Sequence, residues 1–374
     1  MREKFWDPKL KGVDWKGAVA RAAQDISGAR TLAERDAVYD TLLARLEDSH
    51  TFRVPAGRLP PHDWATAGLR IGSDGDGYTV KGVIPDSPAD RAGLRLADRV
   101  LAVDGKTYGR KPVSFRDLFL VFEGTIGSTV RVTWARGPDF EERTALLTRT
   151  PEEPGDALVW KSARIIRREG KAYGYARVWG LSSQTALALV DLLLDREESA
   201  HAKSELTGWE EIEGLLLDVR ANSGGYDPNI LATFLRGRWS SGDYWVVRRG
   251  ERRLKPPEYR PLPVVLLINS GTASAGESLA LKFRRHRIGP IVGERSAGMA
   301  SGGASAETLA DGSTLWLSRS AIEDAEGRSY EGQGIPPDVA VADHPAAAAS
   351  EEDAVIEAGI KVLAGNRETS NVKR

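Results

Sequence analysis

Residues 269–277 read Asn-Ser-Gly-Thr-Ala-Ser-Ala-Gly-Glu, and they separate two stretches of different character. Before them, residues 264–268 (Val-Val-Leu-Leu-Ile) are short, apolar and β-branched, which predicts a buried strand. After them, residues 278–286 carry small and apolar side chains at helical spacing, which predicts a helix. Ser274 is therefore expected at the N-terminus of a helix that directly follows a strand.

The predicted position of Ser274 has two interpretations. Unpaired N–H groups at a helix N-terminus favour negative charge, so a nucleophile that generates an oxyanion would be stabilised there. Ser274 with Glu277 three residues later also fits a capping box, which only satisfies main-chain N–H groups and needs no chemistry. The local sequence favours the cap, and the choice depends on the rest of the chain.

The composition limits the classes of protein to consider. A chain of 374 residues is too long for one ordinary domain and predicts two or three. The net charge of −1 gives no reason to expect nucleic acid or an anionic membrane as a partner. The absence of cysteine excludes disulfides, zinc thiolates and a cysteine nucleophile, and the five histidines lack metal-ligand spacing. We therefore expect no metal and no other cofactor.

The sequence says less about cellular location. No apolar run approaches the length of a membrane span, so we expect a soluble chain without an integral membrane segment. No signal peptide is present, but residues 1–6 already read as an amphipathic start, as though a longer element had been cut. A cytoplasmic protein and an exported one with its signal removed both stay open, as does a homo-oligomer.

Residues 1–62 are predicted to form an N-terminal helical segment. Apolar side chains between residues 33 and 46 fall on one face at helical spacing. The helix ends before Ser49 and His50, and the proline-rich residues 52–62 mark a boundary. A histidine just beyond a helix end is usually structural, so these residues alone do not predict a catalytic role for His50.

Residues 63–150 are predicted to form a small, mostly β domain. Residues 78–83 alternate as a strand, 87–94 (Ser-Pro-Ala-Asp-Arg-Ala-Gly-Leu) predict a short helix, and 98–105 predict a strand closing on an Asp-Gly turn. Further patterns predict a helix over 115–122 and a strand over 129–134. This combination resembles the PDZ modules inserted in bacterial processing proteases.

The PDZ resemblance implies that an extended peptide is captured by strand addition. The main-chain N–H groups of the loop and strand at residues 68–72 would receive the terminal carboxylate of that peptide. The residues concerned are Gly68, Leu69, Arg70, Ile71 and Gly72. The alternative is a β domain that only packs against its neighbour.

Residues 151–374 are predicted to form an α/β domain. Strands over 173–178 and 214–220 are each followed by a helix, over 183–194 and 229–235, which predicts a sheet flanked by helices. Catalytic groups in such folds collect at the carboxyl ends of strands, where Gly224, Gly225 and Ser274 fall. Paired glycines usually mark a tight turn, but after a buried strand they can also bring N–H groups close to a substrate carbonyl.

Four separated motifs, at residues 217–225, 272–277, 292–294 and 331–338, then occur in one order. Together they resemble the C-terminal processing peptidases and the related tricorn-core proteases, and this resemblance covers essentially the whole chain. It implies a multidomain α/β fold with a ClpP/crotonase-like (ββα) serine protease core, an N-terminal helical segment and an inserted PDZ-like domain. It also implies peptides or unfolded proteins as substrates.

One departure selects a branch of this family. C-terminal processing peptidases use a Ser-Lys dyad with the lysine about 25 residues beyond the serine, but that position is Met299. No lysine occurs between Arg284 and Ile360, and Lys361 falls in a helix predicted over 350–363. The chain therefore resembles the tricorn branch, which uses a histidine base.

The tricorn resemblance assigns roles to particular residues. It implies Ser274 as nucleophile, His50 as base, Ser49 as the group that holds the imidazole tautomer, and Glu331 behind Ser49. The N–H groups of Ala275 and of Gly225 or Gly224 would form the oxyanion hole, with Gly225 slightly favoured. Two alternatives stay open: a non-catalytic relative that binds peptides or apolar ligands, and an esterase or amidase that uses the same residues.

Overall fold

The computed structural model describes residues 1, 3–57, 64–73, 77–107, 121–137, 141–193, 206, 208–225, 262–343 and 353–370. The helix predicted over 229–235 and most of that predicted over 115–122 lie outside these residues. The chain divides into two compact units. The first contains Met1–Glu152 and Ala297–Ile335, and the second contains Glu153–Ser296 and Pro336–Arg374.

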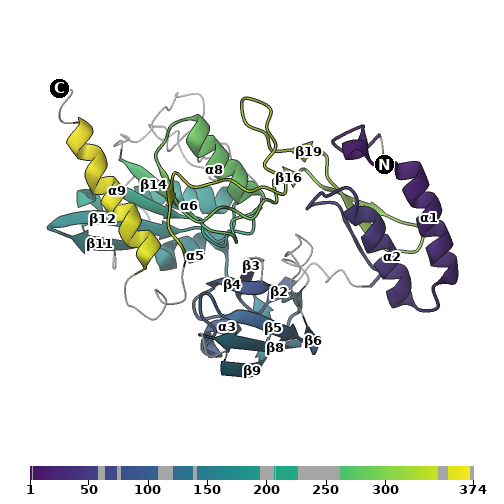
Figure 1. The fold of residues 1–374 in the computed structure, drawn as a ribbon. Helices are drawn as coiled ribbons and strands as arrows, with labels where there is room; N and C mark the ends of the chain where they lie inside the picture. Colours follow the sequence, from purple (N-terminus) through teal and green to yellow (C-terminus); the bar gives the residue numbers. More distant parts are fainter. Residues whose placement is uncertain are drawn as a thin grey trace, which may run out of the picture. The chain divides into compact units, whose positions relative to one another are not determined.

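The first unit begins with a helical segment, as the sequence predicted. A short 3-10 helix, Leu10–Gly12, precedes α1 (Trp15–Gly28) and α2 (Leu32–Ala44), which lie side by side (Figure 1). Each long helix has a polar cap: the Asp14 carboxylate accepts from the Gly17 N–H, and Thr31 forms a capping box with Glu34. These caps fix where both helices begin.

A strand from the second half of the chain completes the helical segment. β1 (Phe52–Val54) pairs antiparallel with β18 (Thr314–Leu317), which pairs with β17 (Ser305–Thr308). A second small pair joins β16 (Ser301–Gly302) to β19 (Ser320–Ala321). The β1–β18 pairing explains why residues 297–335, which the sequence assigns to the α/β domain, form a compact unit with the N-terminus.

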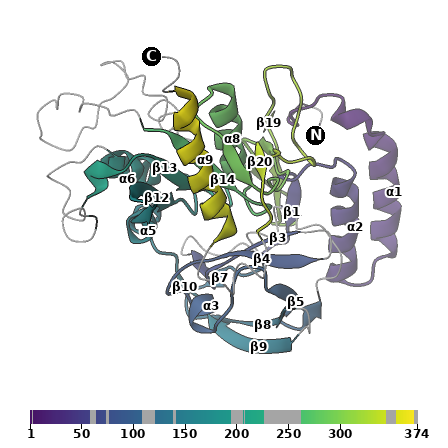
Figure 2. The same ribbon diagram turned by 60° about the vertical axis from the view of Figure 1, so that its left-hand side comes forward.

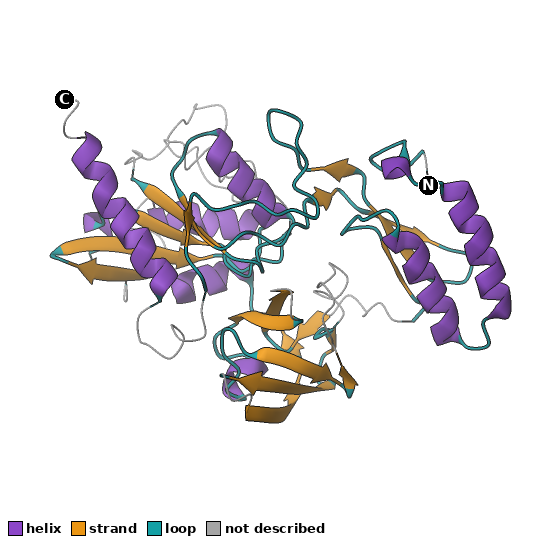
Figure 3. Cartoon of the chain, viewed as in Figure 1, coloured by secondary structure: helices purple, strands orange, loops and turns teal. Residues whose placement is uncertain are grey.

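The PDZ-like part of this unit is mostly strand, with the short helix α3 (Pro88–Arg91) (Figure 3). Its larger sheet has the order β3-β4-β5-β8-β9, with β6 paired to β5. Its strands are β3 (Leu69–Ser73), β4 (Tyr78–Val83), β5 (Arg99–Val103), β6 (Lys106–Thr107), β8 (Thr129–Arg136) and β9 (Glu141–Thr148). A smaller sheet joins β2 (Trp64–Thr66) to β7 (Gly124–Thr125) and β10 (Thr150–Pro151).

The second unit is built on a mostly parallel sheet. Its described strands have the order β11-β12-β13-β14-β15-β20, in which only the β11–β12 pair is antiparallel. They are β11 (Arg164–Arg168), β12 (Lys171–Arg177), β13 (Leu215–Asp218), β14 (Val264–Ile268), β15 (Ile291–Gly293) and β20 (Val339–Ala340). The connecting helices are α5 (Gly155–Ser162), α6 (Ser183–Leu193), the 3-10 turn Trp209–Glu211, and α8 (Ala275–Arg285).

The central strands β12 to β15 are buried on both faces of the sheet, as their near-continuous apolar sequences predict. The C-terminal helix α9 (Ala354–Ser370) lies against β13, β14 and β15 (Figure 2). Its Ile360 and Leu363 pack in one core with alternate strand residues such as Leu216 and Val265. The residues of β13 and β14 that point to the opposite face of the sheet are also buried. These two strands therefore lie at the centre of the unit. The mixed α/β fold expected from the sequence is confirmed.

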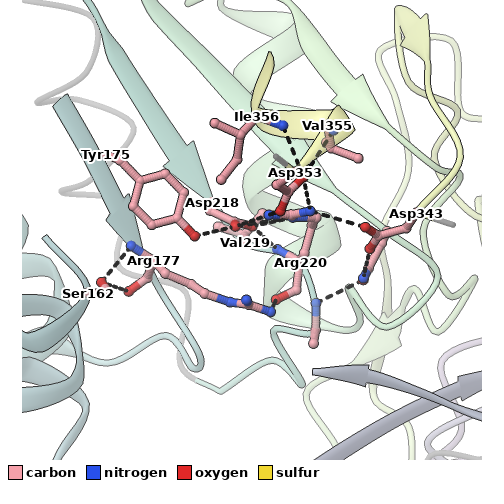
Figure 4. A network of polar contacts seen from close by, with 12 residues as sticks. Ser162, Tyr175, Arg177, Asp218, Val219, Arg220, Asp343, Asp353, Val355 and Ile356 are labelled. Carbon is pink, nitrogen blue, oxygen red and sulfur yellow. Dashed lines mark hydrogen bonds and ion pairs between the residues drawn. The ribbon is translucent and has the colours of Figure 1, made fainter. Parts of the chain in front are cut away.

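A buried ionic network fastens α9 to the carboxyl end of β13 (Figure 4). The Arg220 guanidinium bonds bidentately to Asp218 at 2.7–3.1 Å, and it also reaches Asp343 (3.1 Å) and Asp353 (2.7 Å). The Tyr175 hydroxyl donates to Asp218 at 2.7 Å. Burial alone would raise the pKa of Asp218, but Arg220 holds it well below its usual range. Asp353 in turn accepts the first N–H groups of α9.

We predict that Arg220→Ala destabilises the protein by about 3–5 kcal/mol, because Asp218 and Asp343 would remain buried without their cation. Arg168→Ala is the matched control, since Arg168 also bonds to α9, at Glu357, but through a partly exposed pair worth about 0–1 kcal/mol. Urea unfolding of the two variants measures the difference. Equal losses would show that the buried network has no special role.

Candidate active site

Ser274 lies in a sharp turn between β14 and α8. Its backbone has φ 53° and ψ −120°, a left-handed conformation that is uncommon for a residue with a side chain. Holding such a residue costs on the order of 1–3 kcal/mol, so the surrounding structure must impose it. Strained strand-to-helix turns of this type present a nucleophilic serine in other hydrolases. The strand predicted over 264–268 is observed, and the helix begins three residues earlier than predicted.

Glu277 supports the turn from within α8. Its fully buried carboxylate accepts from the Ser274 N–H at 3.2 Å and from the Ser296 hydroxyl at 2.6 Å. The carboxylate therefore binds the main chain of Ser274, as the capping interpretation requires. Capping does not exclude catalysis, because a serine oxygen that accepts at a helix start keeps its own proton for a base.

Asn222 joins the loops that surround Ser274. Its side chain is fully buried, donates to the Val178 carbonyl and accepts from the Gly224 N–H, both at 2.9 Å. The main-chain carbonyl of Asn222 accepts from the Ala273 N–H at 2.8 Å. One asparagine thus links the carboxyl ends of β12, β13 and β14, and it fixes the approach of the glycine turn to the serine.

The two glycines of this turn have different surroundings. A Cβ atom on Gly224 would lie 2.6 Å from the Ser274 Cβ, so only glycine permits this approach, and its φ of +104° has the same requirement. Gly225 instead forms an isolated parallel β-bridge with Leu181. Because the Gly224 N–H already bonds to Asn222, the Gly225 N–H is the better candidate for an oxyanion donor. The N–H of Ala275, the first residue of α8, is the other candidate.

The first unit contains the predicted base. His50 follows Ser49 between α2 and β1, and its Nδ1 lies 2.9 Å from the Ser49 hydroxyl. The side chain is only 4% exposed, and this burial lowers the pKa of His50 to about 4, although the charge of Asp48 opposes the shift. The imidazole is therefore neutral at ordinary pH, as a general base must be.

Glu331 clamps the main chain around this histidine. Its two carboxylate oxygens accept from the N–H of Ser49 at 2.5 Å and from the N–H of Ser301 at 2.7 Å. Burial raises the pKa of Glu331, although hydrogen bonds from Ser49 oppose that shift. The tertiary fold therefore brings Ser49, His50 and Glu331 together, although 282 positions separate Ser49 from Glu331.

The predicted site residues thus form two groups, each within one unit. Ser274, Ala275, Gly224 and Gly225 surround the strand-to-helix turn of the second unit, and the base cluster belongs to the first. Sequence reasoning missed Ser301, whose hydroxyl lies 3.2 Å from Nδ1 of His50. It also missed the structural role of Asn222. A serine two residues beyond Met299 and an asparagine before a glycine turn carry no local signal for these contacts.

The predicted peptide-binding residues lie at one edge of the PDZ-like sheet. β3 begins at Leu69 and pairs with β4, and it is the first strand in the sheet order. Gly68 precedes it with φ +81°, and a Cβ there would meet Ser87. Arg70 is buried and forms an ion pair with Glu152. An edge strand is the element that strand addition requires, and peptide binding stays a prediction.

The described residues offer neither a metal site nor a membrane-spanning helix. In the described part of the chain, no group of three or more His, Cys, Asp or Glu side chains is arranged to hold a metal ion. Among the described helices, none has the length and apolar character needed to cross a membrane.

Comparison with known proteins defines the class. Residues 173–341 match the model of peptidase family S41, and residues 79–136 match that of the PDZ domain. The chain is therefore similar to peptidase family S41 over residues 173–341 and to the PDZ domain over residues 79–136, which confirms the resemblance predicted from the motifs.

Individual relatives agree with this assignment. Tricorn protease homolog 1 of Streptomyces coelicolor is 27% identical over 99% of this chain and 34% of its own length. The chloroplastic C-terminal processing peptidase of Tetradesmus obliquus is 29% identical over 82% of this chain and 68% of its own length. The solved photosystem II D1 C-terminal processing protease has the same fold, with a TM-score of 0.60 at 23% identity over 91% of this chain and 90% of its own. This chain spans about a third of the length of the Streptomyces relative.

We predict that Gly224→Ala lowers the reactivity of Ser274 by on the order of 100-fold, because the new methyl group would displace the serine by about 1 Å. Gly180→Ala is the matched control, since a Cβ there meets its nearest atom, the Gly224 carbonyl oxygen, at 3.7 Å. Labelling by a fluorophosphonate probe measures the rate. Equal labelling of both variants would mean that the close approach does not matter.

Proposed function

We propose that this protein is a serine endopeptidase that cleaves peptides or unfolded proteins through Ser274, His50, Ser49 and Glu331. The observation that carries the proposal is the hydrogen-bonded arrangement of Ser49, His50 and Glu331 around a buried, neutral imidazole. The proposal requires the Nε2 atom of this histidine to reach the Ser274 hydroxyl during catalysis. The match of residues 173–341 to the model of peptidase family S41 supports it.

The chemistry follows from the two groups of residues. His50 removes the proton of Ser274 as the hydroxyl attacks the scissile carbonyl, and it later delivers that proton to the leaving amine. The Ser49 hydroxyl holds Nδ1 of the imidazole, so Nε2 is the atom that accepts. The N–H groups of Ala275 and Gly225 stabilise the oxyanion, and one such donor typically changes turnover by about 100- to 1000-fold.

The PDZ domain would select the substrate. An extended C-terminal segment added to the edge strand β3 places its carboxylate near residues 68–72. This arrangement favours chains with an accessible C-terminus, such as unfolded proteins. A substrate with an amidated C-terminus should therefore bind more weakly than the free acid, which separates PDZ recognition from recognition at the serine.

The main test is the removal of the nucleophile and of the base. Ser274→Ala and His50→Ala are each expected to abolish cleavage of a quenched peptide, while the circular dichroism spectrum and peptide affinity stay unchanged. Ser270→Ala and His286→Ala are matched controls from the same turn and the end of α8. Full activity in His50→Ala would refute the tetrad even if the serine is essential.

The same variants separate the alternatives. Cleavage of a small ester with no cleavage of any peptide would favour an esterase or amidase. Binding of peptides without turnover of either substrate would favour a non-catalytic relative.

The pH dependence of kcat/KM gives a further prediction. Protonation removes the base, so kcat/KM should remain flat from pH 7 to below 6 and fall only as the pH approaches the His50 pKa of about 4. In the unfolded chain the imidazole takes up its proton near pH 6.5, so this group also lowers stability as the pH falls from about 6.5 to 4. An acid limb near pH 6.5 in the folded enzyme would contradict the buried state of His50.

A further inference from the structure

The Nδ1 atom of His50 faces two hydroxyl groups, and the proposed mechanism uses only one. Ser49 lies 2.9 Å from it and Ser301 lies 3.2 Å from it. The main-chain N–H of His50 also donates to the Ser301 hydroxyl oxygen, at 3.4 Å. Ser301 is fully buried at the start of β16 and comes from a distant part of the chain.

The Ser301 hydroxyl is the first of a line of polar side chains in contact with one another, and this line ends at a second carboxylate, that of Asp48. Its oxygen lies 3.4 Å from the oxygen of Ser318, which is also fully buried. The Ser318 hydroxyl donates to Oδ1 of Asp48, and Oδ2 of Asp48 accepts from the Trp6 indole N–H at 2.9 Å. The charge of Asp48 also acts on His50 and opposes the lowering of its pKa.

The number of protons determines the direction of these hydrogen bonds. A carboxylate cannot donate, so the single proton of Ser318 belongs to the bond with Asp48. Ser318 is then an acceptor for the Ser301 hydroxyl at 3.4 Å, and the Ser49 oxygen, 3.1 Å from Ser301, is a second acceptor for the same proton. With its proton in either bond, Ser301 presents lone pairs to Nδ1 of His50, and this arrangement favours a hydrogen on Nδ1.

The N-terminal segment holds the far end of this line. The indole N–H of Trp6 donates to the Asp48 carboxylate. The main-chain N–H of Trp6 donates to the Ser318 carbonyl at 3.1 Å. Its neighbour Phe5 packs with Leu46 and Leu317 in a small core. Asp48 therefore meets Ser318 in a fixed orientation, set by an indole that can only donate.

We propose that Asp48, Ser318 and Ser301 form a second positioning arm, which fixes the Nδ1–H tautomer of His50 in parallel with Ser49 and Glu331. The assignment of Nε2 as the catalytic base rests on the proposed peptidase function, whereas the tautomer follows from the hydrogen bonds alone. When the imidazole gains a proton, both arms present oxygen lone pairs to it. The titratable groups of this cluster are Asp48 on one arm and Glu331 on the other.

Asp48→Asn gives the sharpest test, because it keeps the shape of the side chain. The Trp6 indole can only donate, so it holds the amide oxygen and turns the amide NH₂ toward Ser318. That change reverses the direction of the hydrogen bonds, so that Ser318 donates to Ser301 and Ser301 donates to Nδ1 of His50. His50 should then shift toward the Nε2–H tautomer, which cannot accept the serine proton.

We expect ¹⁵N NMR of labelled histidine, recorded at neutral pH in a Ser274→Ala background, to show the Nδ1–H form. Asp48→Asn should shift His50 to the Nε2–H form, and Ser301→Ala should give a mixture of the two. Ser305→Ala is the control, since Ser305 is a half-buried serine of β17 that accepts from Arg319 at 2.7 Å, and it should leave the His50 tautomer unchanged. With Ser274 present, Asp48→Asn and Ser301→Ala should each lower kcat about 10- to 100-fold with little change in KM, which is part of the usual 10²- to 10⁴-fold contribution of a general base.

The outcomes separate this inference from the proposed function. An unchanged Nδ1–H signal in both Asp48→Asn and Ser301→Ala, with a shift only in Ser49→Ala, would overturn the second arm and leave the peptidase proposal intact. Because the tautomer is read without turnover, a protein that cleaves no peptide but shows the predicted tautomers would support the arm and refute only the peptidase proposal. Loss of folding in Ser301→Ala would leave Asp48→Asn as the deciding variant.

Discussion

The hydrogen bonds to Nδ1 of His50 are the constraint on which the proposed chemistry depends. A buried imidazole can act as a base only when it is neutral and when its one hydrogen is held on the nitrogen that does not face the nucleophile. Burial supplies the first condition, and the hydroxyls of Ser49 and Ser301 supply the second. Since neither hydroxyl is charged, the carboxylates behind them set the direction of the hydrogen bonds.

The arrangement depends on the pairing of β1 with a strand from a distant part of the chain. The β1–β18 pairing and the clamp formed by Glu331 bring Ser301 and Ser318 to the segment that contains Asp48, Ser49 and His50. The N-terminal residues, which by sequence read only as an amphipathic start, contact the same cluster through Trp6. The helical segment and the strands of residues 297–335 therefore act as one scaffold for the histidine.

The nucleophile depends on a different kind of support. The left-handed backbone of Ser274 is imposed by Glu277 from the helix, by Asn222 from the neighbouring loop and by the absence of a side chain at Gly224. Behind that loop, Arg220 joins β13 to α9 through ion pairs to the buried Asp218 and to the partly exposed Asp353. Rigid packing at the centre of the sheet thus holds the strained Ser274 in place.

The amino-acid sequence by itself indicated the family resemblance, the strand and helix around Ser274 and the candidate base. Those features depend on local spacing or on motifs of neighbouring residues, which a chain retains however it folds. Only the tertiary structure decided which other groups meet these residues. Ser301, Ser318 and Asp48 come from separate loops, and Asn222 contacts three strand ends, so no local pattern predicts their hydrogen bonds. The physical reason is that a buried polar group must find its partner in space, and strand pairing, rather than proximity in sequence, determines which partner is within reach.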